Sequence, residues 1–552
     1  MPNKLACLVF MSVGLLARSP ILAQASNQDD GAEIVAVVPS AKELEDAGAI
    51  IGRVIIEKQN VFDTSLPGEH YSLYRLANRW HVVTRDRVIR QQLLIESGDR
   101  FSQRLIEESE RLLRQNSYLY DARITPVRYE DGVVDIRVGT RDVWTLKPGF
   151  SVGRSGGENH SSAELSESNL LGFGVKLRLA YTENVDRNTT SFDYYDRQIH
   201  DTWWSAYFSY ADASDGGTTY LQLIRPFYAL DSTWSAGTVL FNDEKEVSFY
   251  ELGNEAAEYK AETETYSAYW GWSAGLQENW VTRWSTGIVY DNRDFGTVPN
   301  GQLPSLVPED RRLVYPYLGY ELLENDFQTA SNRDQFERTE DFFMGTSVAA
   351  RLGWASESFG SDRDALVYSM RASTALGSIR RKALFLSSTL GGRLEGGSGI
   401  NTRLGMNVRF YNQITDKRLV FVTLDATWGK DPDLDNLVDL GGDTGLRGYP
   451  LRYQTGDSKI LVTAEQRYFT DWYPFRLVRI GGAIFADIGR TWGENPAGGP
   501  SLGWLKDVGI GLRLGATRSS GRNVVHIDIA FPLDGDPSID DVQLLIGTKS
   551  GF

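Results

Sequence analysis

Hydrophobic and polar residues follow two different patterns along this chain, and the pattern changes near residue 143. Before that point, several apolar residues recur at helical spacing. From about Trp144 to Phe552, segments of about ten residues alternate between polar and apolar, which is the period of a strand with two unlike faces. Tight turns and longer polar loops separate these segments alternately. The sequence therefore predicts a small mixed domain followed by a long β domain.

Residues 50–142 are predicted to form a small α/β domain with the order strand, helix, helix, strand, strand. The expected elements are a strand over Arg53–Glu57, a helix over Asp86–Ile95, a helix capped by Ser102, and strands over Tyr118–Val127 and Val133–Thr140.

Residues 143–552 are expected to form a transmembrane antiparallel β-barrel. In NVVHIDIAF, Val525, Ile527, Ile529 and Phe531 share one face of a strand, and polar residues lie among those on the other. A soluble β-sandwich would bury such an apolar face, but sandwich domains rarely continue for about 400 residues. The 14 Trp and 26 Tyr also suit the aromatic girdles of a membrane barrel. We expect about 16 strands, from roughly 16 to 20 candidate segments.

The first 25 residues have the pattern of a signal peptide. Met1–Lys4 is cationic, Leu5–Ala17 is apolar, and Ala23 and Ala25 are the small residues of a cleavage site. We therefore expect an exported protein.

Composition narrows the function classes further. The formal charge of -16 argues against a nucleic-acid partner. The only cysteine, Cys7, lies in the signal segment, so cleavage after Ala25 would leave neither disulfides nor a thiolate metal site. Residues 26–49 are polar and acidic, and are expected to be a flexible linker. The remaining chain has no apolar run near the roughly 20 residues that a spanning helix needs.

A glycine-rich loop, LGGDTGLRGYPLRYQTGD, follows the acidic run Asp431–Asn436 and centres on Arg447. It could cradle a phosphate, act as a flexible linker, or fold into a confined space. No helix follows that could supply an anion site, and no Walker motif is present. In FADIG, Phe485, Asp487 and Gly489 share one strand face. If the other face meets lipid, Asp487 points into the lumen.

An arginine on a loop folded into the lumen could therefore form a bidentate pair with Asp487. Glu465, on the strand after the loop, is a competing partner. The glycines would let the backbone turn and approach the barrel wall closely. They are Gly441, Gly442, Gly445 and Gly448.

Four ordered features resemble the BamA/TamA superfamily, which includes the two-partner secretion transporters. GGDTGLRGY, with Leu446, Arg447 and Tyr449, resembles its V/I/L-R-G-F/Y loop motif, and FADIG resembles its F-x-D-x-G strand. The last segment, with Val542, Leu544 and Ile546 on one face and Phe552 at its end, resembles the assembly signal of outer-membrane barrels. The domain at 50–142 is similar to a polypeptide-transport-associated (POTRA) domain.

This resemblance implies a protein of the Gram-negative outer membrane with its POTRA domain in the periplasm. It implies that the domain captures unfolded outer-membrane or secreted polypeptides, and that the barrel inserts or exports them. Outer-membrane lipid or lipopolysaccharide and a periplasmic accessory protein are further implied partners. Family members usually carry several POTRA domains, whereas one is visible here, which leaves a specialised role open. A two-partner-secretion-type exporter and a passive pore or receptor are the alternatives.

Enzymatic and metal chemistry are weakly indicated, and we expect neither an enzyme nor a cofactor. GFSVG, Gly149–Gly153, matches the nucleophile elbow around Ser151, but strand alternation continues through it. The five histidines lack metal-ligand spacing. The acidic run Asp431–Asp435 lacks the spacing of a calcium loop and is expected to face solvent or lipopolysaccharide.

Overall fold

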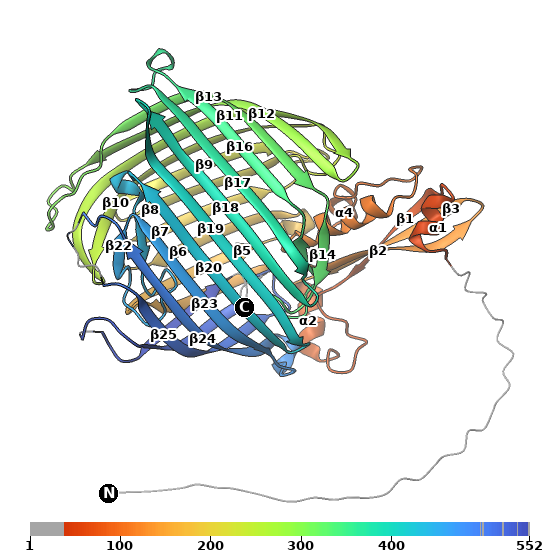
Figure 1. The fold of residues 1–552 in the computed structure, drawn as a ribbon. Coiled ribbons are helices and arrows are strands. Elements are labelled where there is room, and N and C mark those ends of the chain that lie inside the picture. Colours follow the sequence, from red (N-terminus) through yellow and green to blue (C-terminus); the bar gives the residue numbers. More distant parts are fainter. Residues whose placement is uncertain (1–37, 497, 499–501, 522–523, 538, 550–552) are drawn as a thin grey trace, which may run out of the picture.

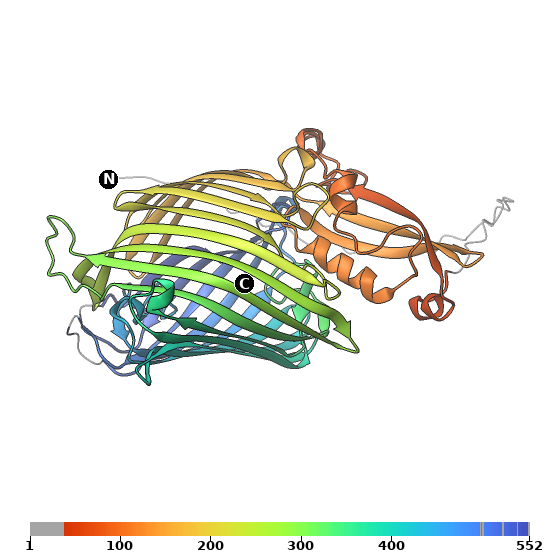
Figure 2. The ribbon, with the colours of Figure 1, turned by 90° about the horizontal axis from the view of Figure 1, so that it is seen from above.

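The computed structural model describes residues 38–552 except 497, 499–501, 522–523, 538 and 550–552. It contains an N-terminal domain and a closed β-barrel, and the domain lies beyond one end of the barrel (Figures 1 and 2). We call this the near end and the opposite one the far end. No helix among the described residues is long and apolar enough to cross a membrane.

The N-terminal domain is a three-stranded sheet covered by helices. Its strands have the order β1-β3-β2, with β1 parallel and β2 antiparallel to the central β3. Ile51, Ile106, Leu113 and Ile136 lie in its core, each at most 1% exposed. The elements are α1 (Ala41–Asp46), β1 (Ile50–Gln59), α2 (Ser72–Trp80), α3 (Asp86–Arg90), α4 (Gln103–Arg114), β2 (Leu119–Glu130) and β3 (Val133–Asp142).

Three details of this domain differ from the sequence prediction. The expected linker over 26–49 contains α1, which Ser40 caps and whose Leu44 is fully buried in the domain core. Helix α2 was not expected. The helix expected to reach Ile95 ends at Arg90, and the Leu94 N–H donates instead to the Ser109 hydroxyl of α4 at 2.9 Å. Contacts between elements outweigh local periodicity here.

Within the described residues the barrel has twenty antiparallel strands, more than the expected 16. Several strands are polar over much of their length, so polar and apolar residues alternate only weakly and the strands are hard to recognise in the sequence. An example is β10, which ends in the acidic stretch DEKEVSFYE. The strands are β4 (Leu146–Ser155), β5 (Glu158–Glu167), β6 (Val175–Glu183), β7 (Asn188–Asp196), β8 (Ser205–Ala213), β9 (Gly216–Arg225), β10 (Trp234–Glu251), β11 (Asn254–Gln277), β12 (Trp280–Gly296), β13 (Arg311–Glu324), β16 (Ser347–Ala355), β17 (Ala365–Ser378), β18 (Lys382–Glu395), β19 (Ser398–Thr415), β20 (Arg418–Lys430), β23 (Ser458–Phe469), β24 (Val478–Trp492), β25 (Leu505–Ala516), β26 (Val524–Pro532) and β27 (Gln543–Lys549).

The barrel is apolar outside and polar inside. On β24, Ile484 points outward and is 57% exposed, whereas the inward Asp487 is 2% exposed. On β25, Ile510 and Asp507 show the same contrast, at 56% and 1%. This arrangement is the inverse of a soluble protein and is typical of a barrel surrounded by lipid.

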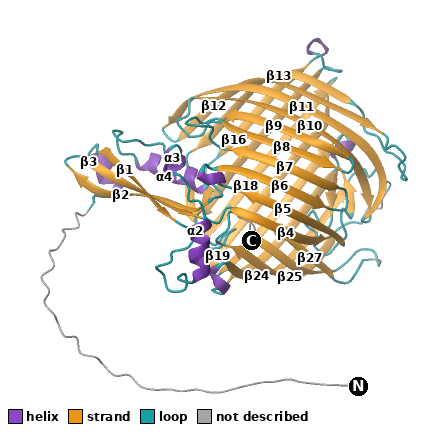
Figure 3. Ribbon diagram, turned by 180° about the vertical axis from the view of Figure 1, so that it is seen from behind, coloured by secondary structure: helices purple, strands orange, loops and turns teal. Residues whose placement is uncertain are grey.

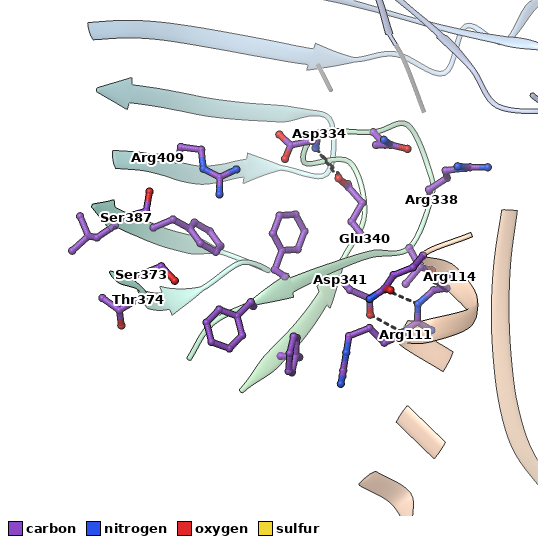
Figure 4. Close-up of a pocket in the computed structure, with 18 of the residues that line it drawn as sticks. Arg111, Arg114, Asp334, Arg338, Glu340, Asp341, Ser373, Thr374, Ser387 and Arg409 are labelled. Carbon is purple, nitrogen blue, oxygen red and sulfur yellow. Dashed lines mark hydrogen bonds and ion pairs between the residues drawn. The ribbon is translucent and has the colours of Figure 1, made fainter. Parts of the chain in front are cut away.

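Short elements occupy loops at both ends. They are η1 (Leu170–Gly172), β14 (Phe327–Ala330), β15 (Glu340–Phe343), η2 (Glu357–Phe359), η3 (Leu434–Asn436), β21 (Val438–Leu440), β22 (Gln454–Gly456) and η4 (Pro474–Arg476). β14 and β15 form a near-end hairpin that meets α4 of the domain beside a pocket of about 530 Å³. There, Arg114 donates to both oxygens of Asp341 at 2.9 and 2.7 Å (Figure 4).

Candidate functional site in the barrel lumen

The loop between β20 and β23, residues 431–457, folds back into the barrel, and we call it the latch loop. Its β21 and β22 pair with each other. Leu446 and Tyr449 have no exposed surface. They form an apolar cluster with Leu440, Tyr453 and wall residues such as Leu461. The loop is thus packed like a protein core, and is neither a linker nor an anion-binding loop.

Arg447 joins the latch loop to the inner wall. Its Nε and Nη2 donate to the two carboxylate oxygens of Asp487 at 2.7 and 2.9 Å. Its Nη1 donates to Glu465 Oε1 at 2.9 Å. The guanidinium carbon lies 3.4 Å from the centre of the Phe485 ring. The structure therefore brings Arg447 together with both acids, which the sequence presented as competitors.

Further charges complete this network on the lumenal wall. Asp528 of β26 lies 3.5 Å from Arg447 Nη1 and also pairs with Arg513 of β25. The Thr463 hydroxyl donates to Asp487 at 2.7 Å, and Arg467 Nε donates to Glu465 at 2.9 Å. The charged residues of this network are almost fully buried, each at most 7% exposed. Removing one charged partner from such a network leaves an uncompensated buried charge.

Two glycines show why the loop motif needs small residues. Gly445 has φ +119°, in the region that favours glycine, and a Cβ there would lie 2.3 Å from Leu461 Cδ2. A Cβ on Gly448 would lie 2.6 Å from Asp507 Cβ, and the Gly448 N–H donates to Asp507 at 3.0 Å. Gly441, Gly442 and, on β24, Gly489 are also buried, each with backbone within 3 Å of its Cβ position.

The hydroxyl of Tyr449 anchors the end of the loop motif to the barrel wall near β25 and β26. It lies 2.6 Å from Asp534 Oδ1 and accepts the Lys506 N–H at 3.0 Å. Asp534 follows β26 and Lys506 lies on β25, so the loop motif contacts successive wall strands. Leu446, Arg447 and Tyr449 thus act as one docked unit.

The acidic run before the motif also faces the wall, which corrects the expectation that it meets solvent or lipopolysaccharide. Asp433 accepts from both terminal nitrogens of Arg393 at 2.6 and 2.8 Å. Asp435 accepts from Arg311 at 2.9 Å and from Arg293 at 3.0 Å. These arginines point inward from three other strands. The alternation of each strand could have predicted that its arginine points inward, but no motif in the sequence singled these residues out.

The seam between β27 and β4 closes the barrel with little pairing. Among the described residues, Ile546 opposite Arg154 is the only register pair between the two strands. β4 pairs with β5 along its whole length, from Leu146 to Ser155. The expected outward face of β27 includes Leu544, 41% exposed, and Val542, 50% exposed, lies just before the strand. Phe552, Ala23 and Ala25 lie outside the described residues.

A polar cluster joins the domain to the barrel just before β4. Thr84 donates to Asp142 through its N–H at 2.7 Å and through its hydroxyl at 2.9 Å. Asn169, in the near-end turn after β5, donates to that hydroxyl at 2.8 Å. Burial raises the pKa of Asp142 to about 6 and lowers the pKa of His81, 3.8 Å away, to about 4.

Ser151 lies within β4 and not at a strand-to-helix turn. Its hydroxyl is 2.7 Å from that of Ser162, opposite it on β5. The nucleophile elbow requires a sharp turn that this strand does not make.

No protein-family model matches this sequence, and no curated protein matches it. Among solved structures, the chain is similar to BamA from Haemophilus ducreyi lacking POTRA domains 1–3, with 15% identity, 90% of this chain and 84% of that chain covered, and a TM-score of 0.38. It is also similar to CdiB from Acinetobacter baumannii, with 11% identity, 91% and 73% coverage and a TM-score of 0.44. For CdiB from Escherichia coli the identity is 13%, the coverage 90% and 76%, and the TM-score 0.43. At these identities and TM-scores the likeness supports no functional conclusion.

Proposed function

We propose that this protein inserts polypeptides into, or transports them across, the outer membrane of a Gram-negative bacterium, with its N-terminal domain in the periplasm. The observation that carries the proposal is the contrast between a barrel wall held by the latch loop and a seam that has one register pair within the described part of the chain. The protein acts on polypeptide clients and needs no cofactor or metal for this role.

The seam supplies a place where a client strand can bind. Backbone N–H and C=O groups without partners are costly in lipid, so the facing edges of β4 and β27, which share one register pair among the residues described, favour strand addition. Opening the seam breaks few hydrogen bonds, and an added client strand can replace them with its own backbone groups. A client hairpin could therefore pair with β4 while the remaining wall keeps its shape.

The domain supplies a second edge. β3 is the central strand, whereas β2 has β3 on one side only, and Pro126 within it is typical of an edge strand. The other edge strand, β1, is partly covered, because the Ile51 N–H donates to the Asp99 carbonyl at 2.8 Å. The first half of β2 is bonded to α4, because the Ile124 N–H donates to Glu110 at 2.6 Å and the Ala122 carbonyl accepts from Arg114 at 3.1 Å. We infer that an extended client binds along the second half of β2, from Pro126 to Glu130, before it reaches the barrel.

A two-partner-secretion-type exporter is the second candidate. It would use the lumen as its path, and the network around Arg447 would then have to open in each transport cycle. The closed packing around Leu446 and Tyr449 favours insertion through the seam over lumenal passage, and it also disfavours a passive pore.

Photocrosslinking from the domain tests the proposal. A photoreactive residue at Val127, on β2, should trap unfolded polypeptides in cells, and identification of the trapped chains separates barrel precursors from one secreted protein. The matched control is Arg137, exposed on the central β3. Equal trapping from both positions, or none from Val127, would contradict capture by the edge strand.

A further inference from the structure

Helix α2 presents an apolar face that the domain core does not cover. Tyr74 is buried against Phe62, and Ala77 packs on the same small cluster with Trp144 and Leu477. In contrast, Leu73, Leu76 and Trp80 are 65%, 49% and 74% exposed. Large apolar side chains grouped in this way usually mark a binding surface.

The exposed residues form one side of an amphipathic helix. At helical spacing, Leu73, Leu76 and Trp80 lie on one arc, and Arg75 and Arg79, both exposed, lie on a separate arc beside it. An apolar face with tryptophan, next to a basic face, is the composition of helices that lie in a membrane interface. Tryptophan and arginine suit the headgroup level, where an apolar body meets a polar layer.

The position of α2 relative to the barrel indicates what covers this face. A groove of about 450 Å³ is lined by α2 residues, Leu73, Leu76 and Trp80 among them, and by Val478 and Ala516. Val478 and Ala516 are register partners at the near ends of β24 and β25, and they lie on the outward face of the wall. Figures 1 and 3 show α2 beside the near end of the barrel. The apolar face of the helix is therefore continuous with the lipid-facing surface of the strands.

The turn between β23 and β24 holds α2 at this place. The Tyr74 hydroxyl donates to the Phe475 carbonyl at 2.6 Å. In the same turn, the side chains of Trp472 and Phe475 are 66% and 81% exposed. Aromatic side chains at the rim of a membrane barrel mark the level of the lipid headgroups.

We propose that α2 is a membrane anchor that lies in the interface of the near-end leaflet, with Leu73, Leu76 and Trp80 among the acyl chains and Arg75 and Arg79 at the phosphates. Its occupant is the lipid bilayer that surrounds the barrel. The proposal rests on the barrel spanning a membrane, but not on the identity or fate of any client.

This anchor has a consequence for the domain. Trp144, which lines the groove with α2, lies two residues before β4. Lipid contact at α2 would therefore hold the domain to one side of the barrel axis, close to the strand that forms the seam. The orientation of the domain would depend on the bilayer as well as on protein contacts.

Depth measurement in a bilayer tests the anchor. In full-length protein carrying Cys7→Ser, a bimane fluorophore is attached at Leu76→Cys, and the protein is placed in nanodiscs with phospholipid spin-labelled near the headgroup. Glu107→Cys, exposed on α4, is the control in solution, and Ile510→Cys, on the outward face of β25, is the control in lipid. These positions are exposed, so the substitutions leave the cores intact.

We expect spin-labelled lipid to quench the Leu76 label several-fold more than the Glu107 label, and at least as much as the Ile510 label, which lies mid-strand and therefore deeper than the headgroups. Quenching equal to that of Glu107 would overturn the proposal. A label shielded from aqueous iodide but not quenched by lipid would also overturn it, and would assign the face to a polypeptide or a second copy. Quenching of Ile510 verifies the barrel in lipid independently, and client transport is not part of the readout.

Discussion

The two sides of β26 differ sharply in how the barrel is held together. Toward β25, the wall is paired from Asp507 to Gly515 and is crossed by the network of the latch loop. Beyond β27, the barrel closes through Ile546 and Arg154 alone among the described residues. The same closed sheet therefore contains a reinforced wall and a weak seam only two strand interfaces apart.

One cause of this difference lies in β4 itself. Its sequence, LKPGFSVGRS, includes Pro148, which has no N–H to donate to a neighbouring strand. β24, in the reinforced wall, has no proline, although it has three glycines to the two of β4, and it places Phe485 and Asp487 under the latch loop. The proline and the latch contacts, and not the glycine content, therefore distinguish the two regions.

Of the substitutions considered, loss of Arg447 should reduce client insertion most, because it undocks the latch loop from the barrel wall. Arg447→Ala leaves the buried Asp487 without its cation, while Glu465 keeps Arg467, and this should destabilise loop docking by about 3–5 kcal/mol. The hydrogen-bonded barrel should still form. We expect protease sensitivity within the latch loop and a marked loss of client insertion, measured beside heat-modifiable migration as a test of barrel folding.

Arg452→Ala is the matched control within the same loop. Arg452 donates to both oxygens of Asp186 at 2.8 and 2.7 Å, but both side chains are more exposed than those of Arg447 and Asp487, so the expected cost is well below that of Arg447→Ala. Arg447→Lys should rank between the two, because a lysine keeps the charge but not the bidentate geometry. Equal activity of the Arg447→Ala and Arg452→Ala proteins would refute a latch role.

A pH series probes the junction between the domain and β4, where the pKa values of Asp142 and His81 are shifted in opposite directions. Asp142 has a pKa of about 6 when folded and 3.8 when unfolded, so its contribution to stability falls as pH rises between these values. His81 has a pKa of about 4 when folded and 6.5 when unfolded, so its contribution rises over that window. The native domain should therefore show little net dependence.

Asp142→Asn removes the contribution of Asp142 to the pH dependence of domain stability. Domain stability should then rise by about 3 kcal/mol between pH 4 and 6.5, because only the charging of the buried His81 remains. Hydrogen exchange of the β3 peptide in the full chain, corrected for intrinsic rates, measures this. A profile as flat as that of the native protein would show that the two groups do not titrate as described.

Much of the fold follows from residue pattern alone. Alternation in strands such as HIDIAF places Asp528 inward and Ile529 outward, and the structure agrees. The strand count was too low because polar strands such as β7 alternate weakly. Helix α2 was missed because its apolar residues face away from the domain, so no core periodicity linked it to its neighbours.

The sequence predicted part of the latch contact but not the rest of the site. The loop motif and the alternation of FADIG together predict that Arg447 pairs with Asp487, whereas the partners of Asp433 and Asp435 lie on distant strands. Only the closed sheet brings Arg393 and Arg311 within reach of the acidic run. The seam depends on the register between the first and last strands, which no local pattern contains.

Locking the seam shows whether clients enter the membrane between β4 and β27. Arg154→Cys with Ile546→Cys joins β4 to β27 at their register pair, and Ser151→Cys with Ser162→Cys joins β4 to β5, both in a Cys7→Ser background. Client insertion is measured in each protein before and after oxidation, and again after reduction. We predict that oxidation stops insertion by the seam pair, that reduction restores it, and that the β4–β5 pair is unaffected. Full insertion activity with the seam covalently closed would contradict the account and favour passage through the lumen.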